Sequence, residues 1–131
     1  MTVLVDTSVW IDYLRAVDPG RAALRELIGG GHAALTDIVL LELLVGPTDE
    51  GRAEALSRFL SGFELLHQVS PVDAEAAAAL HRACRRAGET PRARADCLVA
   101  AVAIRHGVPV LHADRDFDVV ARHSELQVLS P

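Results

Sequence analysis

The stretch VLVDTS, residues 3–8, predicts the fold, because it describes a buried strand that leads directly into a helix. Val3–Val5 is a short apolar run with β-branched residues, which is typical of a strand covered on both faces. The next three residues carry side chains that favour a helix N-terminus. We therefore expect a strand, a helix that reaches about Leu14, and the carboxylate of Asp6 at their junction.

The alternation of strand and helix patterns continues along the whole chain. Further strands are expected at Ala33–Leu35, Glu64–His67, Val108–Leu111 and Gln127–Leu129. Further helices are expected from Pro19 to about Gly29, at Ile38–Val45, from Asp49 to Leu60, at Ala74–Ala87, at Ala95–His106 and after the acidic turn Asp114–Asp118. This order predicts an α/β fold in which helices cover both faces of a central, mainly parallel sheet. The 131 residues suit one compact domain.

The charge of the chain limits the classes of function. A net charge of −5 argues against a protein that binds nucleic acid with its whole surface. All 13 basic residues are arginines. A cluster of them lies between residues 82 and 94: Arg82, Arg85, Arg86, Arg92 and Arg94. Guanidinium groups suit phosphate oxygens, so these arginines are either nucleic-acid contacts or a solvated helix face.

The chain carries no sign of secretion or of a membrane span. Its two cysteines, Cys84 and Cys97, form neither a metal-ligand pattern nor a disulfide framework, so a reduced, cytoplasmic protein is expected. The N-terminus lacks the basic region of a signal peptide. The apolar stretches are far too short to cross a bilayer, and we expect no membrane partner.

Three aspartates occupy ends of predicted elements. Asp6 directly follows the first strand, and Asp114 follows the strand that ends at Leu111. Ligands of parallel α/β sheets bind at the carboxyl ends of the strands, where these two acids are expected. Asp96 stands at the beginning of the apolar helix 95–106. Each of the three also has a simpler interpretation, as a helix cap or a turn residue.

A fourth acid, Glu42, interrupts the apolar run Ile38–Val45. This helix is apolar nearly all round, so we expect much of it to be buried. A buried carboxylate is costly unless it is paired, protonated or bound to a cation. The alternative is that Glu42 occupies the one solvent-facing stripe of its helix.

Carboxylates that converge repel one another and require a compensating positive charge. Oxygen ligands of this kind suit Mg²⁺ or Mn²⁺, and no cluster of cysteine and histidine indicates zinc. A divalent ion held by carboxylates activates water and neutralises charge on a phosphodiester under attack. The four acids together therefore predict metal-dependent hydrolysis of a phosphodiester.

At these residues the sequence resembles the PIN-domain family. The resemblance lies in four ordered segments, Val3–Trp10, Glu42–Gly46, Asp96–Ala103 and Asp114–Phe117, the last in a D-x-D-F form. The set covers essentially the whole chain, and the size and the short first loop resemble the VapC-type toxins of bacterial toxin–antitoxin pairs. The resemblance implies a three-layer α/β/α sandwich with residues 1–131 as one PIN domain. It also implies that Asp6, Glu42, Asp96 and Asp114 are catalytic acids that bind Mg²⁺ or Mn²⁺.

The resemblance further implies an activity and partners. The chain would be a Mg²⁺-dependent endoribonuclease that cuts structured RNA, such as transfer RNA or ribosomal RNA, and so inhibits translation. A homodimer and a cognate VapB-type antitoxin that blocks the site are expected. The first helices would help to receive the antitoxin, although Trp10, Ile11, Tyr13 and Leu14 suit the core equally well.

Several further residues are accessory candidates. Thr7 and Ser8 would place a hydroxyl near the site. Asp116 would either bind the metal through water or cap the following helix, and capping is the interpretation we favour. His112 stands where many relatives carry a small hydroxyl residue, and it would either contact phosphate or end the strand. Arg115 joins the clustered arginines as a candidate RNA contact.

Three other classes of protein are compatible with parts of this pattern. A signalling receiver domain also places acids at strand ends, but it needs a phosphate-contacting lysine, which this chain lacks. A catalytically silent PIN-like binding module is a second alternative, against which all four acid positions are filled. A PIN nuclease of RNA processing, outside the toxins, is the third.

Overall fold

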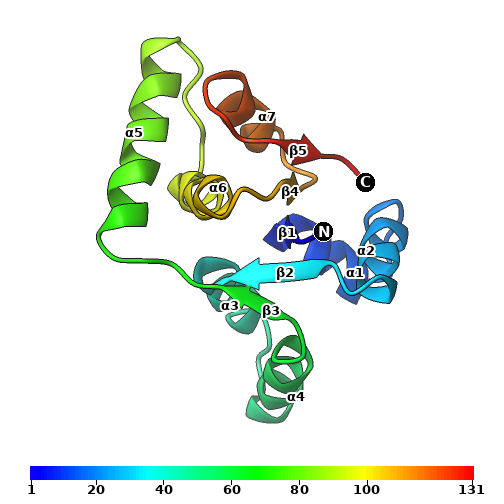
Figure 1. The fold of residues 1–131 in the computed structure, drawn as a ribbon. Coiled ribbons are helices and arrows are strands. Elements are labelled where there is room, and N and C mark those ends of the chain that lie inside the picture. The colour runs from blue at the N-terminus through cyan, green and yellow to red at the C-terminus, as the bar shows by residue number, and fades with distance from the viewer.

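The computed structural model describes all 131 residues and has a five-stranded sheet at its centre (Figure 1). The strands are β1 (Val3–Val5), β2 (Ala33–Thr36), β3 (Glu64–Leu66), β4 (Val110–Leu111) and β5 (Val128–Leu129). Their order across the sheet is β3-β2-β1-β4-β5, and every neighbouring pair is parallel. The prediction of a parallel α/β sheet is confirmed.

Seven helices connect and cover the strands. They are α1 (Thr7–Leu14), α2 (Gly20–Gly29), α3 (Asp37–Leu44), α4 (Glu50–Leu60), α5 (Val72–Arg86), α6 (Arg94–His106) and α7 (Arg115–Arg122). In Figure 1, α1 and α2 lie on one side of the sheet and α5 and α6 on the other, which is the predicted three-layer arrangement. None of these helices has the length and the apolar character that crossing a membrane requires.

The topology creates a switch point between β1 and β4. The chain first builds from β1 outward through β2 to β3, and then returns to place β4 and β5 beyond the other edge of β1. Right-handed connections in opposite directions put the helices on opposite faces. β1 and β4 end at the same level, since Val5 pairs with Leu111 and the Asp6 amide donates to the Leu111 carbonyl at 2.9 Å. Ligands of such folds bind beyond the carboxyl ends of the strands at this point.

The core lies around β1, β2 and helix α6. All residues of β1 and β2 are buried, as is the run Val99–Ala103 of α6. Trp10 is also fully buried, and its indole N–H donates to the Val5 carbonyl at 3.1 Å. Its ring meets Phe63 edge-on with 5.0 Å between centroids. The first helix is therefore clamped onto the end of β1, next to Asp6.

Some element boundaries differ from the prediction for local reasons. The strand expected at Val108–Leu111 starts only at Val110, because the Val108 amide donates to the Ala103 carbonyl and so closes α6. Helix α3 begins at Asp37, one residue before the predicted Ile38, with Thr36 in the N-cap position. Helix α5 begins two residues before the predicted Ala74. None of these shifts changes the topology.

The expectation that α3 would be largely buried is wrong. Only Val39 and Leu43 of this helix are buried, whereas Leu41 and the C-capping Val45 are 57% and 71% exposed. The helix meets the rest of the fold on one face, and an all-apolar helix in that position leaves apolar side chains in solvent. Glu42 is likewise exposed, as the alternative interpretation had it.

Replacement of Gly107 by alanine should destabilise the protein by about 1 kcal/mol, since this residue ends α6 in the left-handed region at φ 67°. Space is not limiting, because nothing lies within 4 Å of the added methyl group. Gly29→Ala is the matched control, because Gly29 ends α2 at an equally open site without a positive φ. Denaturant unfolding of both variants measures the difference. Equal stability of the two would contradict the assignment of strain to position 107.

Candidate active site

Asp6 lies at the switch point, at the end of β1. Its side chain caps α1 and accepts hydrogen bonds from the Ser8 amide at 3.1 Å and the Ser8 hydroxyl at 2.7 Å. The residue is only 4% exposed, and this burial raises the pKa of Asp6, against which the bonds from Ser8 act. The charge of Glu42 raises that pKa further. Asp6 is thus both a helix cap and a carboxylate in an unfavourable electrostatic environment.

Three more aspartates converge beside it. Asp96, Asp114 and Asp116 each offer a carboxylate oxygen, and the three oxygens lie within 4.8 Å of one another. Asp96 comes from the first turn of α6, whereas Asp114 caps α7 and accepts from the Asp116 amide at 3.0 Å. Residues some 20 positions apart in the chain therefore meet in one acidic group.

Asp96 has the least favourable electrostatic environment of this group. It is 8% exposed, and its Oδ2 atom is buried without any hydrogen-bond partner. Burial, followed by the charges of Asp6, Asp114, Asp116 and Glu42, raises the pKa of Asp96 to about 8. A buried carboxylate oxygen that lacks a donor and faces four other acids is in the situation that a bound cation relieves.

Asp116 belongs to the acidic group, contrary to the interpretation that it caps the following helix. Asp114 is the cap of α7, and Asp116 lies inside the first turn, 2% exposed. Its Oδ2 atom accepts from the amides of Arg92 and Ala93 at 2.8 and 3.3 Å. These donors tie the segment before α6 to α7 and so bring Asp96 toward Asp114.

Glu42 approaches the group from α3. It is not among the three acids whose oxygens converge, but its charge acts on both Asp6 and Asp96. Thr7 donates its hydroxyl to Glu42 Oε1 at 2.6 Å, which links α1 to α3 across the site. The predicted hydroxyl residues thus lie at the site, with Ser8 on Asp6 and Thr7 on Glu42. The catalytic role of the four predicted acids stays a prediction.

Arg92 supplies part of the missing positive charge. Its guanidinium lies 3.7 Å from Asp114 Oδ1 and 3.6 Å from Asp116 Oδ1, with the side chain 70% exposed. Ion pairs that are this exposed and this long contribute little. Arg92 therefore leaves most of the repulsion in place, and Asp96 Oδ2 without a partner.

The acidic group offers the oxygen ligands that a hard divalent cation prefers, and neither cysteine nor histidine belongs to it. All the converging donors are oxygens, which Mg²⁺ and Mn²⁺ prefer, and both cysteines are buried and free elsewhere. His112 does not enter the acidic group, because its Nδ1 atom accepts from the Asp114 amide at 3.1 Å. Its Nε2 atom lies 3.2 Å from Asp118 Oδ1 without a properly aligned hydrogen bond. His112 therefore ends β4 and supports the turn that holds Asp114.

The arginines predicted as RNA contacts separate into different places. Arg82, Arg85 and Arg94 line a hollow between α5 and α6, whereas Arg86 does not. Arg92 contacts the acids, and Arg115 lines a separate polar hollow with Arg122. One ion pair that the sequence did not suggest is structural: Arg105 donates to the buried Asp73 at 2.8 Å, which fastens α6 to the start of α5.

Comparison with known proteins agrees with this fold. The family model described as PIN domain matches residues 3–123. The chain belongs to the PIN-domain family. Within it the chain groups with VapC proteins: it is 41% identical to VapC ribonuclease Mb1587 of Mycobacterium bovis and to ribonuclease VapC11 of Mycobacterium tuberculosis, over 98% of each chain.

Solved structures of this PIN-domain group have the same fold. VapBC2 from Rickettsia felis, bound to a DNA fragment from its promoter, matches with a TM-score of 0.78 at 20% identity, over 100% of this chain and 99% of that one. DNA-bound VapBC from Salmonella typhimurium matches with a TM-score of 0.77 at 20% identity, over 99% and 98%. At these identities the likeness concerns the fold alone.

Without divalent cations, Asp96→Asn should stabilise the protein, and increasingly so as the pH rises from about 4 to about 8. The pKa of Asp96 is raised to about 8, so over this range the folded protein keeps a proton that the unfolded chain releases. The wild type should therefore lose up to about 1.4 kcal/mol per pH unit relative to the variant. Unfolding by denaturant in EDTA between pH 5.5 and 8 measures this difference.

Asp73→Asn is the control, for which we expect a loss of stability instead of a gain. The hydrogen bonds from Arg105 lower the pKa of Asp73, so this carboxylate contributes stability above its unfolded pKa, and the variant should be less stable throughout. A difference between wild type and Asp96→Asn that does not change with pH would refute the electrostatic description of the site.

Proposed function

We propose that the chain is a divalent-metal-dependent endoribonuclease that acts as the toxin of a toxin–antitoxin pair, with residues 1–131 forming one PIN domain. The observation that carries the proposal is the buried, unpartnered Oδ2 atom of Asp96 among converging acids at the switch point. The names of the VapC relatives, which are ribonucleases, support the choice of RNA as substrate. The same unpartnered oxygen argues against a silent binding module, because no donor in the fold pairs with it.

Asp96, Asp114 and Asp116, with Asp6 and Glu42 beside them, would hold Mg²⁺ or Mn²⁺. Such an ion supplies an acidic water and neutralises phosphoryl charge. The protein holds its carboxylates ready for this: Ser8 orients Asp6, Thr7 orients Glu42, and the amides before α6 orient Asp116. Ligands fixed by such bonds need little reorganisation on binding.

The proposed reaction is hydrolysis of an RNA phosphodiester by water, which would leave a 5′-phosphate and a 3′-hydroxyl. No protein side chain acts as the nucleophile. The proposed substrates are structured RNAs of translation, transfer RNA or ribosomal RNA, whose cleavage would inhibit protein synthesis. Without the cation the clustered acids repel RNA, so the ion would be needed for binding as well as for rate.

The proposed partners are a VapB-type antitoxin and a second copy of the chain. Of the apolar residues of α1, Trp10 belongs to the core, whereas Leu14 is exposed and Tyr13 stacks on the partly exposed Phe59 of α4. This surface of α1 and α4 is the part of the first helices that remains free to receive an antitoxin. Exposed apolar surface beside polar residues is typical of such a contact.

Cleavage of a mixed RNA pool tests the function. The wild type should cleave RNA with Mg²⁺ and lose the activity in EDTA. Asp96→Asn should lower kcat by more than about 100-fold while the protein stays folded by circular dichroism, because the site loses a charged ligand. Glu54→Gln, at an exposed acid of α4, is the matched control and should cleave normally. Full activity of a folded Asp96→Asn protein would overturn the proposal.

A further inference from the structure

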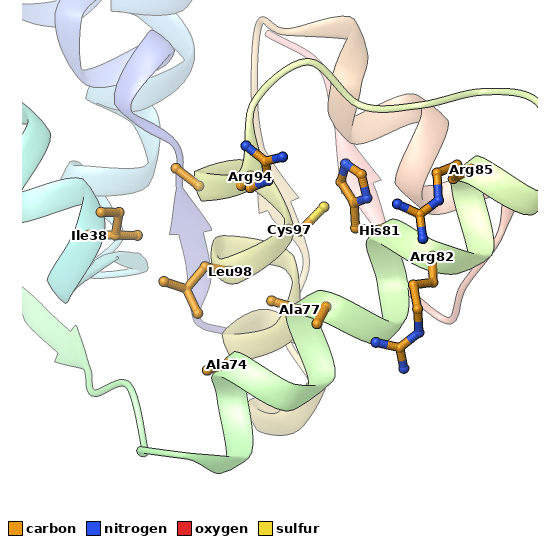
Figure 2. Close-up of a pocket in the computed structure, with 11 residues that line it drawn as sticks. Ile38, Ala74, Ala77, His81, Arg82, Arg85, Arg94, Cys97 and Leu98 are labelled. Carbon is orange, nitrogen blue, oxygen red and sulfur yellow. The ribbon is translucent and has the colours of Figure 1, made fainter.

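A hollow of about 560 Å³ lies between α5, α6 and the start of α3. Its floor is apolar and includes the buried Ala77 and the half-buried Ile38 and Leu98, while its rim carries the exposed Arg82, Arg85 and Arg94. None of the residues that line it is acidic. Figure 2 shows Arg82 and Arg85 projecting from α5 and Arg94 at the beginning of α6. In a chain with a net charge of −5, this concentration of positive charge is a local exception.

The hollow shares two elements with the acidic site. Asp96 stands between Ala95 and Cys97, and both of these neighbours line the hollow. Ile38, on its floor, lies one turn before Glu42 on the same face of α3. The first turn of α6 therefore has the acids on one side and the hollow on the other. A polymer bound at the acids needs to cross only the first turn of α6 to reach the hollow.

We propose that this hollow receives one unpaired nucleotide of the RNA next to the bond that is cut. The inference deepens the proposed function and rests on it. The apolar floor suits the face of a base, and a volume of about 560 Å³ is within the range of small-ligand pockets. The planar guanidinium groups of the arginines suit the phosphates on either side of this nucleotide, because each can donate two parallel hydrogen bonds. RNA is recognised mainly through such unstacked nucleotides, which splay out of loops and ends.

Charge complementarity favours RNA over the other possible occupants. A polyanion gains from the arginine rim and, through a divalent ion, from the acids on the other side of α6. An apolar segment of an antitoxin would bury the rim arginines without a counter-charge, which is costly. A second copy of this chain is the other possible occupant. These occupants are the outcomes against which the experiment is designed.

Filling the hollow is the first test. Ala78 is exposed on α5 and lines the hollow, whereas Ala79, also exposed on α5, does not. Ala78→Trp should raise KM for RNA about tenfold, the factor that corresponds to losing the contact of one base, with kcat within about twofold. Ala79→Trp should leave both parameters unchanged.

Removing one rim charge is the second test. Arg85→Gln should weaken RNA binding and reduce the slope of log affinity against log salt by about 0.7, as expected for one lost phosphate contact to a single strand. Arg86→Gln removes the same charge from the next residue of the helix, outside the hollow, and should leave the slope unchanged. Fluorescence anisotropy with a labelled single-stranded RNA, with all acids intact and Ca²⁺ in place of Mg²⁺ so that an ion is present, measures binding separately from Mg²⁺-dependent cleavage.

These measurements separate the inference from the function on which it rests. The hollow is not an RNA site if Ala78→Trp and Ala79→Trp change KM equally, or if Arg85→Gln and Arg86→Gln change the salt slope equally. So does a change of oligomeric mass in Ala78→Trp by analytical ultracentrifugation, or a loss of antitoxin affinity with RNA binding intact. A wild type that binds RNA through the hollow but never cleaves it with Mg²⁺ overturns the proposed function alone.

Discussion

The mutual repulsion of carboxylates at the carboxyl ends of β1 and β4 is the constraint on which the rest of this structure depends. Asp96, Asp114 and Asp116 present oxygens within 4.8 Å of one another, and Asp6 and Glu42 add their charges to Asp96. Nearby Arg92 offsets only part of this repulsion, because it is exposed and its distances are long. Such an arrangement costs stability in the free protein. Protonation relieves this repulsion at Asp96 alone, as its raised pKa reflects, whereas a ligand of opposite charge would relieve the whole group.

The scaffold holds these acids together through its most buried elements. β1 and β4 pair directly, so the residues that follow them start from the same level of the sheet. α1 is fastened to the end of β1 through Trp10, and α6 carries Asp96 on a helix whose following turns are buried. Arg105 and Asp73 fix α6 against α5, far from the acids. The packed core therefore keeps the acids close together in spite of their repulsion.

Much of this could be predicted from the sequence, because strands, helix starts and acids carry local signals. Val3–Val5 followed by Asp6, and the alternation of strands and helices, led to the parallel sheet and to the expectation that Asp6 and Asp114 lie at the carboxyl ends of its strands. Asp116 was misinterpreted as a cap because an acid two residues after Asp114 has the same local pattern whether it caps a helix or faces the site. The exposure of Glu42 depends on which face of α3 meets the core, which periodicity in an all-apolar helix does not reveal. The hollow lined by Ile38, Arg82 and Arg94 brings together distant segments, and no local pattern marks it.

Anomalous diffraction from crystals grown with Mn²⁺ tests the central claim most directly. The account predicts a peak bounded by the carboxylates of Asp96, Asp114 and Asp116, with an oxygen of Asp96 at about 2.1–2.2 Å from the ion, the distance typical of hard cations of this size. The peak should be absent from crystals of Asp96→Asn grown in the same way. Wild-type crystals that show no anomalous density at these acids, in saturating Mn²⁺ and at a pH where they are ionised, would contradict it.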